Sequence, residues 1–240
     1  MNDFKNYSDI IWDAFNIHIK KTELVDRKKE ILDKILEYYN SSPRTYLFLG
    51  FSPLIFTVHE SAKVVVGHCS PNTLNEINKQ RVISEFNLND VKKFDCVVAT
   101  DEFFTFAKSE EDQKSNIFQL CNLTNDVLIT TVKDYKNQDF KEREFSSPAI
   151  IKTQSTITAF TEIHNWDSQD KNKWQTAVYQ LQSEEAKCRG LFDRRTLYFK
   201  QLAKFTSDFG ANDFLVHKNL MYKSLIKKNY EHVISVKFDK

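Results

Sequence analysis

The sequence predicts an α/β protein with a mostly parallel sheet that helices cover on both faces. Short apolar runs, rich in β-branched residues, recur along the first 133 positions of the chain. These runs are continuous rather than alternating, which is typical of strands that are buried on both faces. The segments between them have helical periodicity or helix start signals. A hydrophobic content of 41% over 240 residues is sufficient for one packed core.

Two helices are expected before the first strand, over residues 3–20 and 23–40. In the second, Leu24, Ile31 and Ile35 recur at helical spacing. Pro43 ends it, because proline disfavours the helical conformation in the residue before it.

The predicted strands of the parallel sheet have apolar or β-branched composition, the run at 82–86 being the weakest of them. A helix is expected between the last two strands, because Ser109 can cap it and acidic residues follow in its first turn. Alternating strands and helices of this length predict right-handed crossovers between parallel strands. The strands are expected at 45–50, 63–68, 82–86, 94–100 and 127–133.

The second half of the chain changes pattern. Two strand-like segments at 156–163 and 174–181 are joined by a polar loop, which predicts an antiparallel hairpin. Apolar periodicity over 194–209 predicts a helix that ends at Gly210, and strands are expected at 214–218 and 230–238. We therefore expect a single domain over 1–240, with N-terminal helices (1–43), a core (44–137 and 187–240) and an inserted hairpin (138–186).

Several classes of protein are disfavoured by the sequence. The four cysteines lie far apart without ligand spacing, so we expect no zinc site, no disulfide framework and a reducing cytoplasm. His59, His217 and His232 likewise have no partner at metal-ligand spacing. The N-terminus has no signal-peptide pattern, and no apolar run has the length of a membrane span. Ser8, Ser52 and Cys121 lack the motif or the matched base that a nucleophile requires.

The order of these elements resembles the class I S-adenosylmethionine-dependent methyltransferase fold, which is Rossmann-like. The resemblance covers residues 44–137 and 190–238. Leu49-Gly50 stands where the family's first strand runs into its glycine-rich loop. Phe94-Asp95 opens the fourth strand as an aromatic-Asp pair, and Asp134-Tyr135 follows the fifth. The resemblance implies S-adenosylmethionine as cofactor and methyl transfer to an acceptor that the sequence does not identify.

The resemblance assigns the cofactor end of the site to Gly50, Phe51, Ser52 and His68. Two departures from the family's pattern fall there. In the family, glycines follow the first strand and allow the backbone to approach a ligand closely. In this sequence those positions hold Phe51, Ser52 and Pro53. The family also places a carboxylate after its second strand, and here His68 follows Gly67 instead. His68 could donate a hydrogen bond to a ligand in that place, or it could be structural.

Candidate catalytic residues follow the fourth and fifth strands. Asp101 and Glu102 come after one, and Asp134 and Tyr135 after the other. Because parallel strands end at one edge of the sheet, these side chains are expected to converge there. A carboxylate could act as general base toward the acceptor, with Tyr135 positioning it. The alternative is that both pairs are ordinary turn residues.

Basic residues gather in residues 151–240, where 15 Lys and Arg stand against 10 Asp and Glu, although the whole chain has a net charge of only +1. They could contact nucleic-acid phosphates, or they could form a solvated helix face. The residues are Lys187, Arg189, Arg194, Arg195, Lys200 and Lys204.

Two functions therefore remain open from the sequence. One is a divergent methyltransferase, and the other is a catalytically degenerate methyltransferase-like module that acts by binding or as a structural protein. Trp166 and Trp174 bracket the loop of the hairpin and could pack it onto the sheet or cover the crevice.

Overall fold

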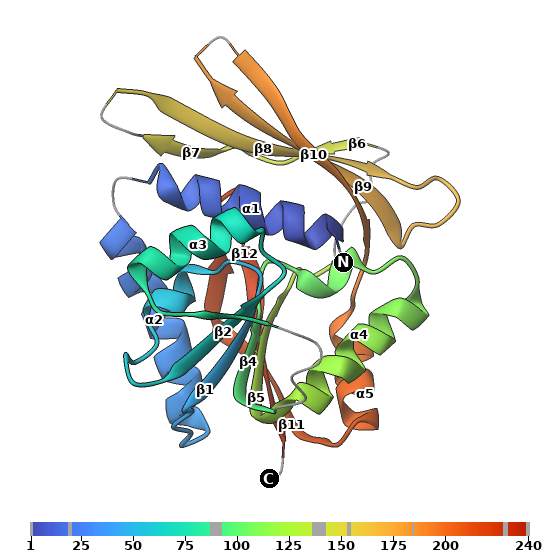
Figure 1. Cartoon of the computed structure of the whole chain (residues 1–240). Helices are drawn as coiled ribbons and strands as arrows, with labels where there is room; N and C mark the ends of the chain where they lie inside the picture. Colours follow the sequence, from blue (N-terminus) through green and yellow to red (C-terminus); the bar gives the residue numbers. More distant parts are fainter. Residues whose placement is uncertain are drawn as a thin grey trace.

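The computed structural model describes residues 2–18, 21–86, 93–135, 143–152, 155–183, 185–227 and 230–238. It contains two β-sheets, with helix α1 (Asn2–Asn16) between them (Figure 1). The larger sheet forms the core with helices on both of its faces, and the smaller sheet lies across its upper end. The predicted α/β class with a mostly parallel sheet is confirmed.

The main sheet has seven strands in the order β11-β12-β5-β4-β1-β2-β3. Strands β1 to β5 are parallel to one another, whereas β12 runs antiparallel to both β5 and β11. The predicted strands are all present, but the weakest one shrinks to two residues. The bounds are β1 Thr45–Leu49, β2 Lys63–Gly67, β3 Ser84–Glu85, β4 Phe94–Ala99, β5 Thr124–Val132, β11 Ala211–Lys223 and β12 Tyr230–Phe238.

The central strands are apolar because both of their faces are covered. Leu47 of β1 pairs in register with Val65 of β2 and with Val97 of β4. All three side chains are 5% exposed or less. Burial of this kind, at about 25 cal/mol per Å² of apolar surface, is the main force that holds such a sheet together.

Four further helices pack against this sheet. Figure 1 shows α2 (Lys21–Tyr38) and α3 (Pro71–Gln80) on one side and α4 (Glu110–Leu123) and α5 (Phe199–Asp208) on the other. The predicted cap of α4 is confirmed, because the Ser109 side chain accepts a hydrogen bond from the amide of Asp112 at 3.1 Å. No helix in the described part of the chain is long and apolar enough to cross a membrane.

The segment between β5 and α5 differs from the prediction. The expected hairpin is present as β8 and β9, but it forms the centre of a five-stranded antiparallel sheet. This second sheet continues through β10, so the core does not resume at 187 and helix α5 begins at Phe199 instead of 194. That the chain is one domain stays a prediction. The strands are β6 Arg143–Phe145, β7 Ala149–Lys152, β8 Ile157–Trp166, β9 Lys173–Gln182 and β10 Glu185–Arg195.

Candidate functional site

The carboxyl ends of β1, β2, β4 and β5 meet at the edge of the main sheet that faces α1 and the second sheet (Figure 1). Ligands of open α/β sheets bind at this edge. All eight predicted site residues lie in the loops directly beyond these strands. The edge has two halves with different chemistry, one beside β1 and one beside β4, β5 and β12.

The half beside β1 is filled by α1. Gly50 follows β1 with a φ of +79°, and a Cβ added to it would lie 2.6 Å from the Cε1 atom of Phe4. The Phe4 ring also packs edge-on against Phe103 at a centroid distance of 4.7 Å. Next along α1, the Ser8 hydroxyl accepts a hydrogen bond from the amide of Phe51 at 2.6 Å. The backbone at Gly50 and Phe51 could approach a ligand in an open crevice, but here it contacts α1 instead.

The other residues predicted for the cofactor end also face protein. Phe51 is 2% exposed and packs against Trp12 at 4.8 Å and Phe15 at 5.2 Å between ring centroids. Ser52 is 2% exposed and caps the short helix η1 (Pro53–Phe56). An open crevice would leave such residues accessible to solvent. Here aromatic side chains of α1 occupy the space.

His68 has a left-handed backbone with a φ of +55° at the end of β2. Its ring lies 5.7 Å from that of Phe103 and 6.4 Å from that of Phe4, measured between centroids. Burial lowers the pKa of His68 to about 4, so the imidazole is neutral at physiological pH. It packs as an uncharged ring beneath α1.

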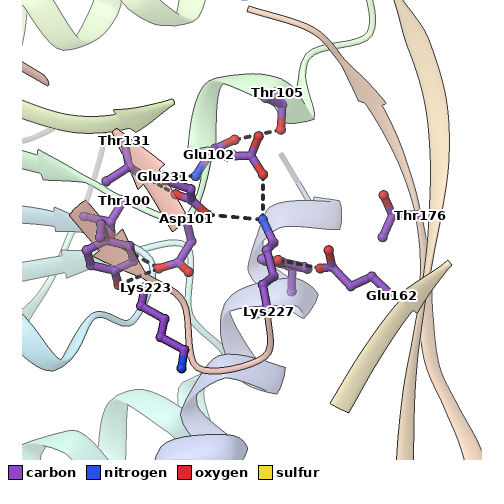
Figure 2. Close-up of polar contacts among 12 residues, drawn as sticks. Thr100, Asp101, Glu102, Thr105, Thr131, Glu162, Thr176, Lys223, Lys227 and Glu231 are labelled. Atoms are coloured by element: carbon purple, nitrogen blue, oxygen red, sulfur yellow. Dashed lines mark hydrogen bonds and ion pairs between the residues drawn. The ribbon is translucent and has the colours of Figure 1, made fainter. Parts of the chain in front are cut away.

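The second half of the edge holds buried charges, centred on Glu102 (Figure 2). Lys227 donates to its Oε2 atom at 2.6 Å, and Arg194 of β10 approaches the same atom at 3.4 Å. The hydroxyl of Tyr135 donates to the other carboxylate oxygen. Burial acts to raise the pKa of Glu102, but Lys227 and Arg194 outweigh it and hold the pKa far below its usual range.

Glu231 on β12 completes this cluster. Its carboxylate accepts hydrogen bonds from Thr131 at 2.5 Å and from Lys227 at 3.3 Å. Because burial outweighs the attraction of Lys227, and because Glu102 and Asp101 repel its charge, the pKa of Glu231 is raised to about 7. A carboxyl with such a pKa can give or take a proton near neutral pH.

Asp101 lies on the far side of this cluster (Figure 2). Its Oδ2 atom accepts hydrogen bonds from Tyr222 at 2.8 Å and from Thr100 at 3.2 Å. Lys28 of α2 lies 3.2 Å from the centroid of the Tyr222 ring. Burial lowers the pKa of Lys28 to about 7, although Asp101 and Glu231 act to raise it.

Two spaces border the cluster. A cavity of about 20 Å³ lies between the main sheet and the second sheet, with Glu102, Tyr135, Glu162 and Glu231 in its wall. That is close to the room one water molecule needs. Trp174 and Arg194 line this cavity and also an open groove of about 870 Å³ between the second sheet and the η2–α4 segment, where η2 is Phe103–Phe106.

The groove has an apolar floor and polar walls. Phe106, Ala107 and Trp174 form the floor and are 7% exposed or less. The walls carry carboxylates from Asp3, Asp112 and Asp167, whereas the Asp193 side chain lies between the buried Phe192 and Arg194 and points to the other face of β10. Lys108, Lys173 and Arg194 also line the groove, but Arg194 is paired with Glu102 and Lys173 lies 3.8 Å from Asp170.

The predicted catalytic residues are thus brought together only in part. Glu102 and Tyr135 are in direct contact, whereas Asp101 contacts Tyr222 and lies apart from Tyr135. Asp134 is half-buried beyond β5, where its neighbours Lys133 and Tyr135 line the small cavity. Their catalytic roles stay predictions. The described residues include no group of three or more His, Cys, Asp or Glu side chains that could hold a metal ion.

The sequence does not place Arg194, Lys227 or Glu231 beside Glu102, and it assigns Arg194 to a basic surface instead. Arg194 is 92 positions from Glu102 and Lys227 is 125 positions from it, so no local motif joins them. The only available signal was an acidic residue in an apolar strand, since Glu231 stands in the run that forms β12.

The predicted basic helix is wrong, because its residues lie on two different elements. Lys187, Arg189, Arg194 and Arg195 are on β10, whereas Lys200 and Lys204 are on α5. Three of the arginines have acidic partners: Arg194 pairs with Glu102, Arg189 with Asp13 at 2.5 Å, and Arg195 with Asp170 at 3.1 Å. These residues therefore do not lie on the single helix that the sequence predicts.

Comparison with known proteins identifies the fold. No family model and no curated sequence matches the chain. Among solved structures, DesVI of Streptomyces venezuelae has a TM-score of 0.70 at 10% identity, over 97% of this chain and 98% of its own. A S-adenosylmethionine-dependent methyltransferase from Clostridium acetobutylicum has a TM-score of 0.64 at 13% identity, over 90% and 92%. CalS10 of Micromonospora echinaspora, an amino pentose methyltransferase solved with bound S-adenosylmethionine, has a TM-score of 0.67 at 9% identity, over 88% and 90%.

The chain has the class I S-adenosylmethionine-dependent methyltransferase fold, as the order of its elements predicts. The residues at the cofactor end do not fit S-adenosylmethionine while α1 lies in the crevice. Gly50 is covered by Phe4, and both Phe51 and Asp101 are 2% exposed or less. His68 stands after β2, where the family has a carboxylate for the ribose.

Proposed function

We propose that this chain is a binding protein with a methyltransferase fold, in which α1 replaces the cofactor and the open groove takes a small polar ligand. The main support for the proposal is that α1 covers the residues at the carboxyl end of β1. Phe4, Ser8, Trp12 and Phe15 of α1 contact the backbone and side chains of residues 50–51. A protein that loaded S-adenosylmethionine there would first have to remove this helix.

Removing α1 would be costly. Phe4, Tyr7, Ile11 and Phe15 are each 2% exposed or less. Exposing a buried Phe or Ile side chain costs about 1.5–3 kcal/mol each, so undocking the helix costs several kcal/mol in total. A ligand would have to supply that free energy on top of its own binding cost.

Calorimetry with S-adenosylmethionine and S-adenosylhomocysteine tests the proposal. The native chain should give no binding heat and no thermal shift at millimolar ligand. Phe4→Ala removes the ring that covers Gly50, and Asn6→Ala is its control, because Asn6 is an exposed residue of the same helix. Binding by the native chain would overturn the proposal.

The second candidate is a methyltransferase whose N-terminal helix opens. The fold favours it, since the proteins of similar structure are S-adenosylmethionine-dependent methyltransferases. Glu231 also favours it, because a carboxyl with a pKa of about 7 suits proton transfer from an acceptor. If Phe4→Ala binds S-adenosylmethionine while the native chain and Asn6→Ala do not, this candidate takes precedence.

For the groove we propose an amino sugar as the class of ligand. An aromatic floor suits the apolar face of a sugar ring, while carboxylates and amides in the walls suit ammonium and hydroxyl groups. CalS10 is an amino pentose methyltransferase, and KedS8 from Streptoalloteichus is a sugar N-methyltransferase. The three carboxylates of the groove, from Asp3, Asp112 and Asp167, favour a cation over an anion.

Titration with glucosamine, glucose and glucose 6-phosphate, followed by tryptophan fluorescence and calorimetry, tests this ligand class. Glucosamine should bind most tightly and glucose 6-phosphate most weakly. Asp112→Asn should weaken glucosamine about tenfold, because it removes one charge from the wall. Glu76→Gln, an exposed change on α3, should have no effect. Equal affinity for the three sugars, or none, would contradict the proposal.

A further inference from the structure

One face of the second sheet points away from the main sheet (Figure 1), and this outer face carries exposed apolar side chains. An antiparallel sheet with one covered face ordinarily presents polar side chains on the other. Along β8 the even positions are buried, and the odd positions 157, 159, 161 and 163 face outward. Ile157 is 59% exposed, and Phe145, Ile150 and Leu191 on other strands are 66%, 61% and 59% exposed. These four are large apolar side chains held in one surface.

Strand register arranges the outer face in rows across the sheet. Phe145 pairs with Ile163, which pairs with Ala177, which pairs with Leu191. A second apolar row contains Ile150, Ala159, Leu181 and Ala186. Between the two rows lie Thr161 and Tyr179, which are also neighbours in register. The apolar surface therefore extends over β6 to β10.

A polar row borders this surface and carries opposite charges at its two ends. Arg143 on β6 donates to Asn165 at 2.9 Å, and Asp193 on β10 accepts from Gln175 at 3.2 Å. Asn165 and Gln175 are paired between them in register. Both charged residues are exposed, so the row presents a cation at one edge of the sheet and an anion at the other.

We propose that the outer face docks a second copy of this chain, related by a two-fold axis that runs parallel to the strands between β8 and β9. Such an axis places each row of one copy against the same row of the second copy, with the strands in reverse order. Arg143 then faces Asp193 of the second copy, and Asn165 faces Gln175. In the apolar row, the exposed side chains of Phe145 and Leu191 face each other, and between them Ile163 lies opposite Ala177, which is only 4% exposed. The symmetry pairs opposite charges with each other and apolar side chains with each other, as a self-complementary two-fold interface requires.

The size of the face agrees with a dimer interface. Four strands about 4.8 Å apart and a length of about ten residues at 3.4 Å each give a projected area of roughly 650 Å² per copy. A stable interface needs about 800 Å² of accessible surface per partner, and accessible area exceeds projected area for a surface of protruding side chains.

Sedimentation equilibrium of the full chain over a concentration series tests the proposal. The native chain should reach twice its monomer mass. Leu191→Lys should raise the dissociation constant about thirtyfold or more, because it places an ammonium group against an apolar row. Val82→Lys changes an 86% exposed apolar residue between α3 and β3, away from the second sheet, and should leave the mass unchanged.

Charge reversal tests the direction of the axis. Arg143→Asp and Asp193→Arg should each weaken the dimer about tenfold, since each places like charges opposite one another. The double variant should regain most of the native affinity, which no other axis predicts. Circular dichroism melting of each variant verifies folding. A native chain that stays monomeric, a dimer that ignores Leu191→Lys, or a double variant no better than the singles would overturn the proposal.

Discussion

The two halves of the sheet edge differ in what fills them. Beside β1, aromatic side chains of α1 pack against Gly50 and Phe51 without a buried ion pair. Beside β4, β5 and β12, the buried groups are charged, and Glu102 is held by Lys227 and Arg194. The edge where ligands bind in open α/β sheets thus holds an apolar contact in one half and buried polar groups in the other. The comparison teaches that the two halves of one sheet edge can be packed independently of each other.

Breaking the charged half should have the largest effect. Lys227→Met removes the cation that lies between Glu102 and Glu231 and leaves buried carboxylate charge less compensated. We expect a loss of about 3–5 kcal/mol in the free energy of unfolding, measured with urea at pH 7. Lys34→Met is the control, since its pair with Glu30 is exposed and should change stability by less than about 0.5 kcal/mol. Similar losses in both variants would show that burial of the cluster is not what matters.

The pH dependence of stability isolates Glu231. Its pKa rises from an ordinary value of 4.5 to about 7 on folding, so the folded chain binds the proton more tightly. Relative to Glu231→Gln, the native chain should therefore lose stability as pH rises from about 4.5 to about 7, by about 3 kcal/mol in total. Above pH 7 the difference should be constant. Urea unfolding of both proteins across this range measures it, and parallel curves would refute the assignment.

The uncharged half is tested by a smaller change. Gly50→Ala should cost about 2 kcal/mol, because alanine is strained at a φ of +79° and its Cβ would meet the Phe4 ring. The two causes separate in a double-mutant cycle with Phe4→Ala, in which the cost of Gly50→Ala should fall by about half. Unfolding by urea gives the four free energies. Strict additivity would mean that α1 does not press on Gly50.

The sequence predicted the core better than the insertion. The runs around Leu47, Val65 and Val97 are continuous and apolar because helices cover both faces, and that pattern is visible locally. Strand β10 was mistaken for the start of a helix because its charged residues, Lys187 to Arg195, conceal the pairing with β9. Whether such a segment forms a strand depends on the strand that it pairs with, and its own sequence does not identify that partner.

The site was predicted to the extent that it depends on strand ends. Glu102 and Tyr135 could be placed because both follow predicted parallel strands, and they do meet. Their partners Arg194 and Lys227 come from the second sheet and from the loop before β12, so only the folded chain brings them near. The position of Phe4 over Gly50 could not be predicted either. Helical periodicity indicates which face of a helix is apolar, but it does not indicate which part of the protein that face packs against.

The contact between Phe4 and Gly50 has a consequence for the chain in the cell. A protein that binds a metabolite in its native state gains stability in proportion to the logarithm of that metabolite's concentration. Here the occupant of the crevice is part of the same polypeptide, and its amount never varies relative to the site. Under the proposed function, the free energy of unfolding of this chain is therefore expected not to change with the concentration of S-adenosylmethionine.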